Sequence, residues 1–88
     1  LLASDSGTII AAGWHYSSGN YVEIDHGNGY RTLYGHMSSI AVTQGQAVSQ
    51  GQTIGYVGST GNSTGNHCHF EMSYNGALFS AYTLFAGM

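Results

Sequence analysis

Short apolar runs alternate with turn-forming residues along the whole 88-residue chain. This spacing is typical of an antiparallel sheet. It predicts strands over residues 8–13, 21–26, 30–36, 53–57, 67–74 and 77–79. No stretch keeps a sustained helical period, and only the tail, residues 80–88, is expected to form a short helical turn. The chain is therefore predicted to be all-β, a small antiparallel β-sheet domain.

Face assignments follow from strand alternation. In segment 21–26, Val22 and Ile24 are predicted to face one side of the sheet, and Glu23 and Asp25 the other. Residues 27–29 supply a tight hairpin, and the returning strand is predicted to place Thr32, Tyr34 and His36 on one face.

The connecting segments carry their own signals. Two near-repeats, VTQGQ at 42–46 and VSQGQ at 48–52, are predicted to form successive turns around short strands. Residues 58–66 form a long polar loop in this interpretation, and residues 75–76 turn the chain into its last strand.

Composition narrows the classes of function. Only 6% of residues are charged, Arg31 is the single fixed cation, and the net charge is −3, so nucleic-acid binding is not expected. No apolar run approaches the length of a membrane span. Because Cys68 is the only cysteine, no disulfide can form within the chain.

The segment HCHFEM at 67–72 is the main candidate for chemistry. Alternation predicts one row of His67, His69 and Glu71, and an opposite core row of Cys68, Phe70 and Met72. The spacing alone leaves two interpretations open. The two histidines are either metal or acid–base groups, or they are polar residues on the solvated face of a strand.

Other titratable residues rank below this pair. His36, at a strand end, is the third candidate, whereas His15 and His26 are expected to be structural or merely exposed. Glu71 shares the predicted face of the histidines, where a hydrogen-bonding or surface role is favoured over activation of a water molecule.

Several motifs in order resemble the lysostaphin/LytM-type zinc endopeptidases, which cut peptidoglycan peptides. They are DSGTIIAAGW at 5–14, VEIDHGNGY at 22–30, LYGHM at 33–37, VSQGQTIG at 48–55, GSTG at 58–61 and HCHFE at 67–71. The resemblance covers nearly the whole chain and implies the duplicated-hybrid-motif-like fold of these peptidases.

The resemblance also implies roles for individual residues. His69 would be a zinc ligand, and His67 would accept a proton from the zinc-bound water. His36 would orient that water or stabilise the charge developing on the intermediate, and Tyr34 would line the substrate cleft. These roles imply a peptidoglycan peptide as substrate and an extracellular or cell-envelope location, in a protein of bacterial or phage origin.

One departure from the family pattern matters most. The family takes two further zinc ligands from an HxxxD motif, and no histidine stands four residues before Asp5. Asn66 and Cys68 also replace the usual Pro and Leu around the first histidine of the pair. Residues 1–88 are therefore expected to form a single peptidase domain, incomplete at its N-terminus, with an incomplete zinc site.

Two further expectations follow from this departure. The alternative function is a non-catalytic relative that binds cell-wall peptide or regulates a partner enzyme. In addition, two chains are expected to pair through exposed sheet edges.

Overall fold

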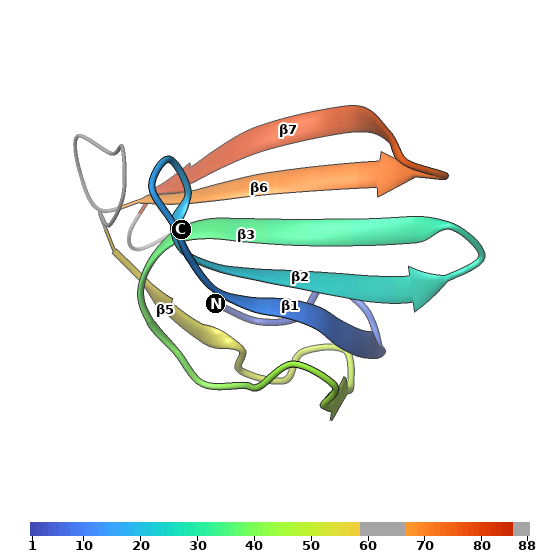
Figure 1. Cartoon of the computed structure of the whole chain (residues 1–88), viewed down its shortest axis with the longest axis horizontal. Helices are drawn as coiled ribbons and strands as arrows, with labels where there is room; N and C mark the ends of the chain where they lie inside the picture. The colour runs from blue at the N-terminus through green and yellow to red at the C-terminus, as the bar shows by residue number, and fades with distance from the viewer. Residues whose placement is uncertain (59–66, 86–88) are drawn as a thin grey trace.

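One antiparallel sheet organises the molecule (Figure 1). A computed structural model describes residues 1–58 and 67–85, with side chains at residues 1–58 and 69–78. The strands are β1 (Gly7–His15), β2 (Gly19–Gly27), β3 (Tyr30–Ile40), β4 (Ala47–Val48), β5 (Gly55–Val57), β6 (His67–Tyr74) and β7 (Ala77–Phe85). Their order is β4-β1-β2-β3-β6-β7, and β5 pairs with β3. The predicted all-β fold is confirmed.

Two Asn-Gly turns close the hairpins β2–β3 and β6–β7 at the same end of the sheet (Figure 1). Asn28 and Gly29 have φ of 54° and 85°, and Asn75 and Gly76 have φ of 50° and 83°. Two consecutive positive φ values match the hairpin turn whose twist suits the flanking strands. The Asn75 N–H donates to the Gly29 carbonyl at 2.8 Å, so the two turns support each other.

The core lies between one face of the sheet and the segment of residues 41–54, whose turns lead to β5. Val22 and Ile24 are fully buried there, which confirms the alternation predicted for β2. Met37 and Ile54 are also fully buried, and Phe70 packs against this cluster. The other core members are Ala3, Ile9, Tyr34, Val42 and Val48.

The near-repeats at 42–46 and 48–52 form two turns of the same geometry, as predicted. In each, the N–H of the last Gln donates to the carbonyl three residues earlier, at 3.1 Å and 3.0 Å. Gly45 and Gly51 occupy the third position with φ of 91° and 81°, which favours glycine there.

The predicted helical turn over residues 80–88 is wrong as far as Phe85, because β7 continues to that residue. The backbone of β7 pairs with β6 along its length, up to Phe85 opposite His67. Tyr82 and Thr83 favour the extended conformation, so pairing and propensity agree. Residues 86–88, and most of the predicted loop over 58–66, lie outside the described residues.

Candidate active site

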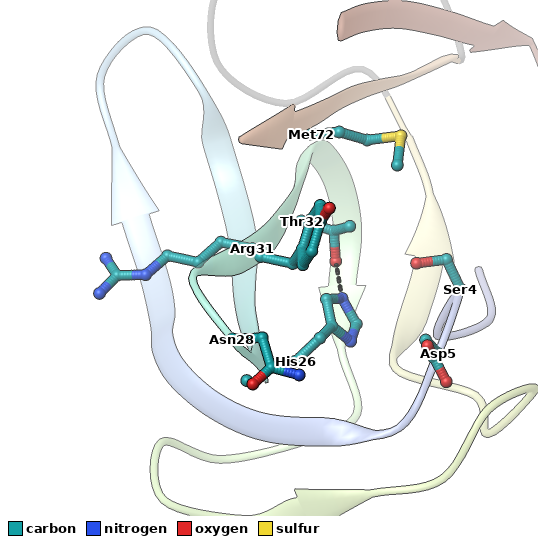
Figure 2. Close-up of a pocket in the computed structure, with 9 residues that line it drawn as sticks. Ser4, Asp5, His26, Asn28, Arg31, Thr32 and Met72 are labelled. Atoms are coloured by element: carbon teal, nitrogen blue, oxygen red, sulfur yellow. Dashed lines mark hydrogen bonds between the residues drawn. The ribbon is translucent and has the colours of Figure 1, made fainter. Parts of the chain in front are cut away.

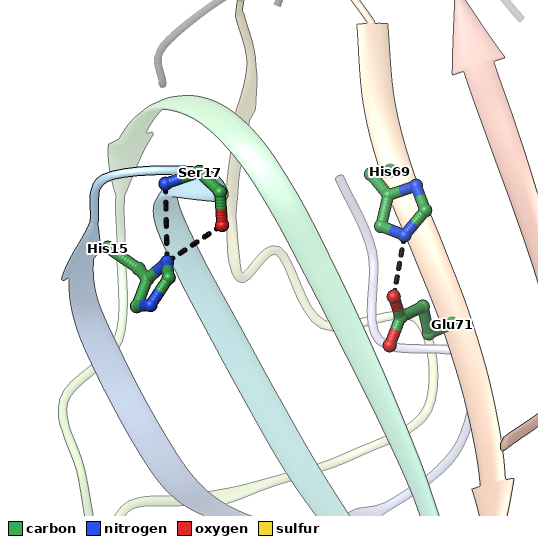
Figure 3. Close-up of polar contacts among 4 residues, drawn as sticks. All are labelled: His15, Ser17, His69 and Glu71. Carbon is green, nitrogen blue, oxygen red and sulfur yellow. Dashed lines mark hydrogen bonds and ion pairs between the residues drawn. The ribbon is translucent and has the colours of Figure 1, made fainter. Parts of the chain in front are cut away.

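His69 and Glu71 lie two residues apart on β6 and contact each other directly (Figure 3). The imidazole Nε2 is 2.7 Å from the carboxylate Oε2, and each side chain is 34% exposed. Strand alternation explains the contact, because residues two apart share a face. The carboxylate accepts a hydrogen bond from Nε2 and thereby fixes the orientation of the ring.

A β-bulge places His36 beside this pair. Val22 lies opposite Tyr34 and Asn20 opposite Met37, so Gly35 and His36 together oppose one residue of β2. His36 adopts a φ of 59°, which is uncommon for a residue other than glycine. Bulges re-aim side chains and occur often near active sites.

Two contacts define the position of His36. Its N–H donates to the Ser18 carbonyl at 2.6 Å, and the residue is 9% exposed. Its ring lies 6.3 Å from the ring of His69, between centroids, at an interplanar angle of 69°. The bulge thus brings two of the three predicted histidines together.

The bulge also corrects the predicted face of His36. Tyr34 pairs with Phe70, and their rings meet edge to face at 5.1 Å on the core side. Gly35 pairs with His69, which therefore projects from the opposite side of the sheet. The prediction that His36 continues the face of Tyr34 is wrong, because the extra residue of the bulge shifts the alternation.

Tyr34, predicted to line the substrate cleft, is 2% exposed and belongs to the core cluster. Its hydroxyl accepts from the Ser4 N–H at 3.0 Å and donates to Ser4 Oγ at 3.1 Å. The Thr32 hydroxyl donates to the same oxygen at 3.2 Å. These contacts give the side chain a place in the core, and its contact with substrate stays a prediction.

His67 begins β6, where its backbone pairs with Phe85. Its side chain, like that of Cys68, lies outside the described side chains. The proton-accepting role of His67 therefore stays a prediction, as does the core placement of Cys68.

The family model for peptidase family M23 matches residues 1–80 of the chain. The chain belongs to peptidase family M23. It is 48% identical over 81 residues to the peptidoglycan DD-endopeptidase ShyA of Vibrio cholerae, covering 92% of this chain and 19% of ShyA. It thus spans about a fifth of that relative's length. The predicted family is confirmed.

Solved structures agree with this assignment. The catalytic domain of lysostaphin from Staphylococcus simulans superposes with a TM-score of 0.83 at 40% identity, over 91% of this chain and 60% of that one. A zinc-containing peptidase from Vibrio cholerae gives 0.82 at 39% identity, over 85% of this chain and 23% of that one. The M23 fold is therefore established for this chain.

The described side chains of this M23 chain do not form a complete metal site. Among the side chains of residues 1–58 and 69–78, no group of three or more His, Cys, Asp or Glu is arranged to hold a metal ion. A catalytic zinc normally has three protein ligands and an open position. Among the described side chains, His69 with its bound carboxylate has the arrangement of one such ligand.

His26 contacts Thr32 directly (Figure 2). Its Nδ1 donates to the Ser6 carbonyl at 2.8 Å, and its Nε2 lies 2.7 Å from Thr32 Oγ1. It lines a pocket of about 340 Å³ together with Arg31 and Met72, among others. These bonds tie β2 to β3 and to the segment before β1, in keeping with the structural role expected of His26.

Sequence reasoning missed the contribution of the β1–β2 hairpin. The Ser18 carbonyl holds the backbone of His36, and Tyr21 lies opposite the bulge. A signal was present in the sequence: after Thr32 and Tyr34, the next large apolar core residue is Met37, which breaks the period of two. Such a change of phase is typical of a bulge.

Proposed function

We propose that the protein containing this chain is a zinc-dependent endopeptidase of bacterial cell-wall peptidoglycan, which hydrolyses a stem or cross-bridge peptide bond. The observation that carries the proposal is the convergence of His36 and His69, with Glu71 bound to His69. Membership of family M23 and the similarity to ShyA support the reaction and the substrate class. The family match over residues 1–80 supports treating the chain as one peptidase domain.

Zinc would be held by His69 and by ligands from outside the described side chains. With Nε2 of His69 bound to Glu71, the metal would be coordinated through Nδ1. A carboxylate on the second nitrogen of a ligating histidine fixes the ring and raises its basicity. When bound, zinc lowers the pKa of a coordinated water and polarises the substrate carbonyl.

His67 and His36 would handle protons and charge around the peptide bond. In this proposal, His67 accepts the proton of the attacking water, because an imidazole takes up a proton readily near neutral pH. His36 is held in its left-handed conformation by Ser18 and orients the attacking water or stabilises the charge that develops on the intermediate. Substrate contact by Tyr34 would require its hydroxyl to exchange the bonds it makes to Ser4 and Thr32.

The proposed substrate lies outside the cytoplasmic membrane, so we propose an extracellular or cell-envelope location. In the described part of the chain, no helix is long and apolar enough to cross a membrane.

β4 and β7 end the strand order, and we propose that two copies can pair along such an edge. Light scattering tests the pairing: a dimer is expected, and a strict monomer at high concentration contradicts it.

The test of the function uses purified peptidoglycan and the full-length protein. Soluble peptide fragments are expected to appear, to cease when zinc is chelated, and to return when zinc is restored. A protein that binds zinc and peptidoglycan but releases no fragments would contradict the proposal. That result would instead establish the alternative, a non-catalytic family member that binds cell-wall peptide or regulates a partner enzyme.

A further inference from the structure

A small pocket lies between the β1–β2 hairpin and β3, on the face of the sheet that carries His69. It is lined by His15, Ser18, Tyr21 and Leu33 and is called the hairpin pocket below. Leu33 pairs with Glu71 across β3 and β6, so both project to the same side of the sheet. The hairpin pocket is therefore continuous with the face proposed for catalysis.

The hairpin pocket is tied to His36 by the backbone. The Ser18 carbonyl accepts the His36 N–H at 2.6 Å, and Tyr21 lies opposite the bulge formed by Gly35 and His36. In Figure 3, His15 on this hairpin and His69 on β6 flank the same end of β3. A group bound in the pocket would thus sit beside the reacting bond.

Hydrogen bonds within the hairpin fix the tautomer of His15. Its Nδ1 accepts the Ser17 N–H at 3.2 Å and lies 2.9 Å from Ser17 Oγ (Figure 3). Because a backbone N–H can only donate, Nδ1 carries no proton, and the neutral ring carries its proton on Nε2. The exposed His15 ring therefore presents an N–H donor at the pocket.

An aromatic platform extends from this ring. Tyr16 stacks on His15 with centroids 4.5 Å apart and planes inclined by 30°, and Tyr16 is 81% exposed. Ligand pockets are lined predominantly by apolar and aromatic side chains. The outer face of Tyr16, backed by the His15 ring, suits a ligand with an apolar face.

The charges on this side of the sheet argue against an anionic ligand. No residue that lines the hairpin pocket carries a fixed charge, and Arg31, the only fixed cation of the sequence, lines the pocket of Figure 2 instead. Glu23 lies opposite Leu33 on β2, and its carboxylate would repel an anion. A neutral ligand with hydroxyl and amide groups fits these surroundings.

We propose that the hairpin pocket binds a pyranose ring of the N-acetylated glycan strand that carries the peptide to be cut. The apolar face of the sugar would stack on the outer face of Tyr16, which is backed by the His15 ring. The acetamido carbonyl would accept the His15 Nε2–H, while the sugar hydroxyls would bond to Ser18 and Tyr21. This inference rests on the proposed function, because peptidoglycan joins such glycans to the peptides that an M23 endopeptidase would cut.

The test measures the binding of a soluble N-acetylglucosamine tetramer, free of peptide, to the full-length protein by calorimetry or NMR titration. Tyr16→Ser is expected to weaken binding about tenfold, since it removes a stacking partner. Tyr21→Phe keeps the ring, removes only the hydroxyl, and is expected to weaken binding several-fold. Tyr56→Ser is the matched control, because Tyr56 is 57% exposed on β5, and it is expected to bind as the wild type does.

A second variant separates this inference from the proposed function. His69→Ala is expected to abolish cleavage of peptidoglycan while it keeps binding of the tetramer. If the wild type cleaves peptidoglycan but the tetramer does not bind, or binds equally well to Tyr16→Ser, the glycan subsite is contradicted. The proposed endopeptidase activity is then still supported. If the tetramer binds through Tyr16 and the wild type cleaves no peptidoglycan, the glycan subsite is supported and the proposed endopeptidase activity is contradicted.

Discussion

His69 Nε2 and Glu71 Oε2 lie 2.7 Å apart on β6, and this contact fixes which imidazole nitrogen can coordinate a metal. Removing the carboxylate in Glu71→Ala is expected to lower zinc affinity about 10–100-fold, because the ligand loses its orienting partner. Glu71→Gln keeps a hydrogen-bond acceptor and is expected to lose less. Competition with a chromophoric chelator measures both, and an unchanged affinity in the alanine variant would contradict this role.

Two substitutions at His36 separate the loss of its imidazole from the strain of its left-handed backbone. His36→Asn and His36→Val are both expected to lose about 10²–10⁴-fold in kcat/KM, since each removes the imidazole. Asn tolerates a φ of 59°, whereas a β-branched residue does not, so the Val variant is expected to be less stable by about 1–2 kcal/mol. Urea denaturation checks the difference, and equal stability of the two variants would rule out this account of the bulge.

Tyr34 has two competing roles that one substitution distinguishes. Tyr34→Phe leaves Ser4 and Thr32 without their shared partner and is expected to cost about 1–2 kcal/mol of unfolding free energy. The matched control is Tyr56→Phe, at an exposed position, where little change is expected. Thermal or chemical denaturation measures the loss of stability. Unchanged stability together with a raised KM would favour the substrate-binding role predicted from the sequence.

Glycine substitutions test the packing of β1 against β2. A methyl group at Gly7 would overlap the Asp25 carbonyl and lie 2.8 Å from Ile24 Cγ2, so Gly7→Ala is expected to cost about 1–3 kcal/mol. At Gly13, on the same strand, an added methyl meets nothing within 4 Å, and Gly13→Ala is expected to stay within about 0.5 kcal/mol of the wild type. Equal effects in denaturation would show that this strand register is wrong.

The alternation of apolar and polar residues predicted β2, and the Asn-Gly pairs predicted the turns. Residues 22–25 of β2 alternate because Val22 and Ile24 are buried and Glu23 and Asp25 are only half-buried. Both Asn-Gly turns carry the residues that positive φ favours. Only residues 77–79 of β7 were predicted as a strand, because its extended conformation beyond them depends on pairing with β6 and no local period marks it. Nonlocal pairing of this kind cannot be seen from one segment alone.

The sequence indicated residues of the candidate site but predicted only part of their geometry. Alternation placed His69 and Glu71 on one face, and they do meet. It failed at His36, because the bulge inserts one residue and turns the imidazole away from the face of Tyr34. The role of Ser18 depends on a contact between the β1–β2 hairpin and the bulge at His36 in β3. The spacing of residues along the sequence does not reveal this contact.

The most direct test of the central claim measures zinc content and peptidoglycan hydrolysis together, in the full-length protein and in His67→Ala and His69→Ala. The account predicts one zinc per chain in the wild type, loss of both zinc and hydrolysis in His69→Ala, and retained zinc without hydrolysis in His67→Ala. Full zinc content and undiminished hydrolysis in His69→Ala would contradict it.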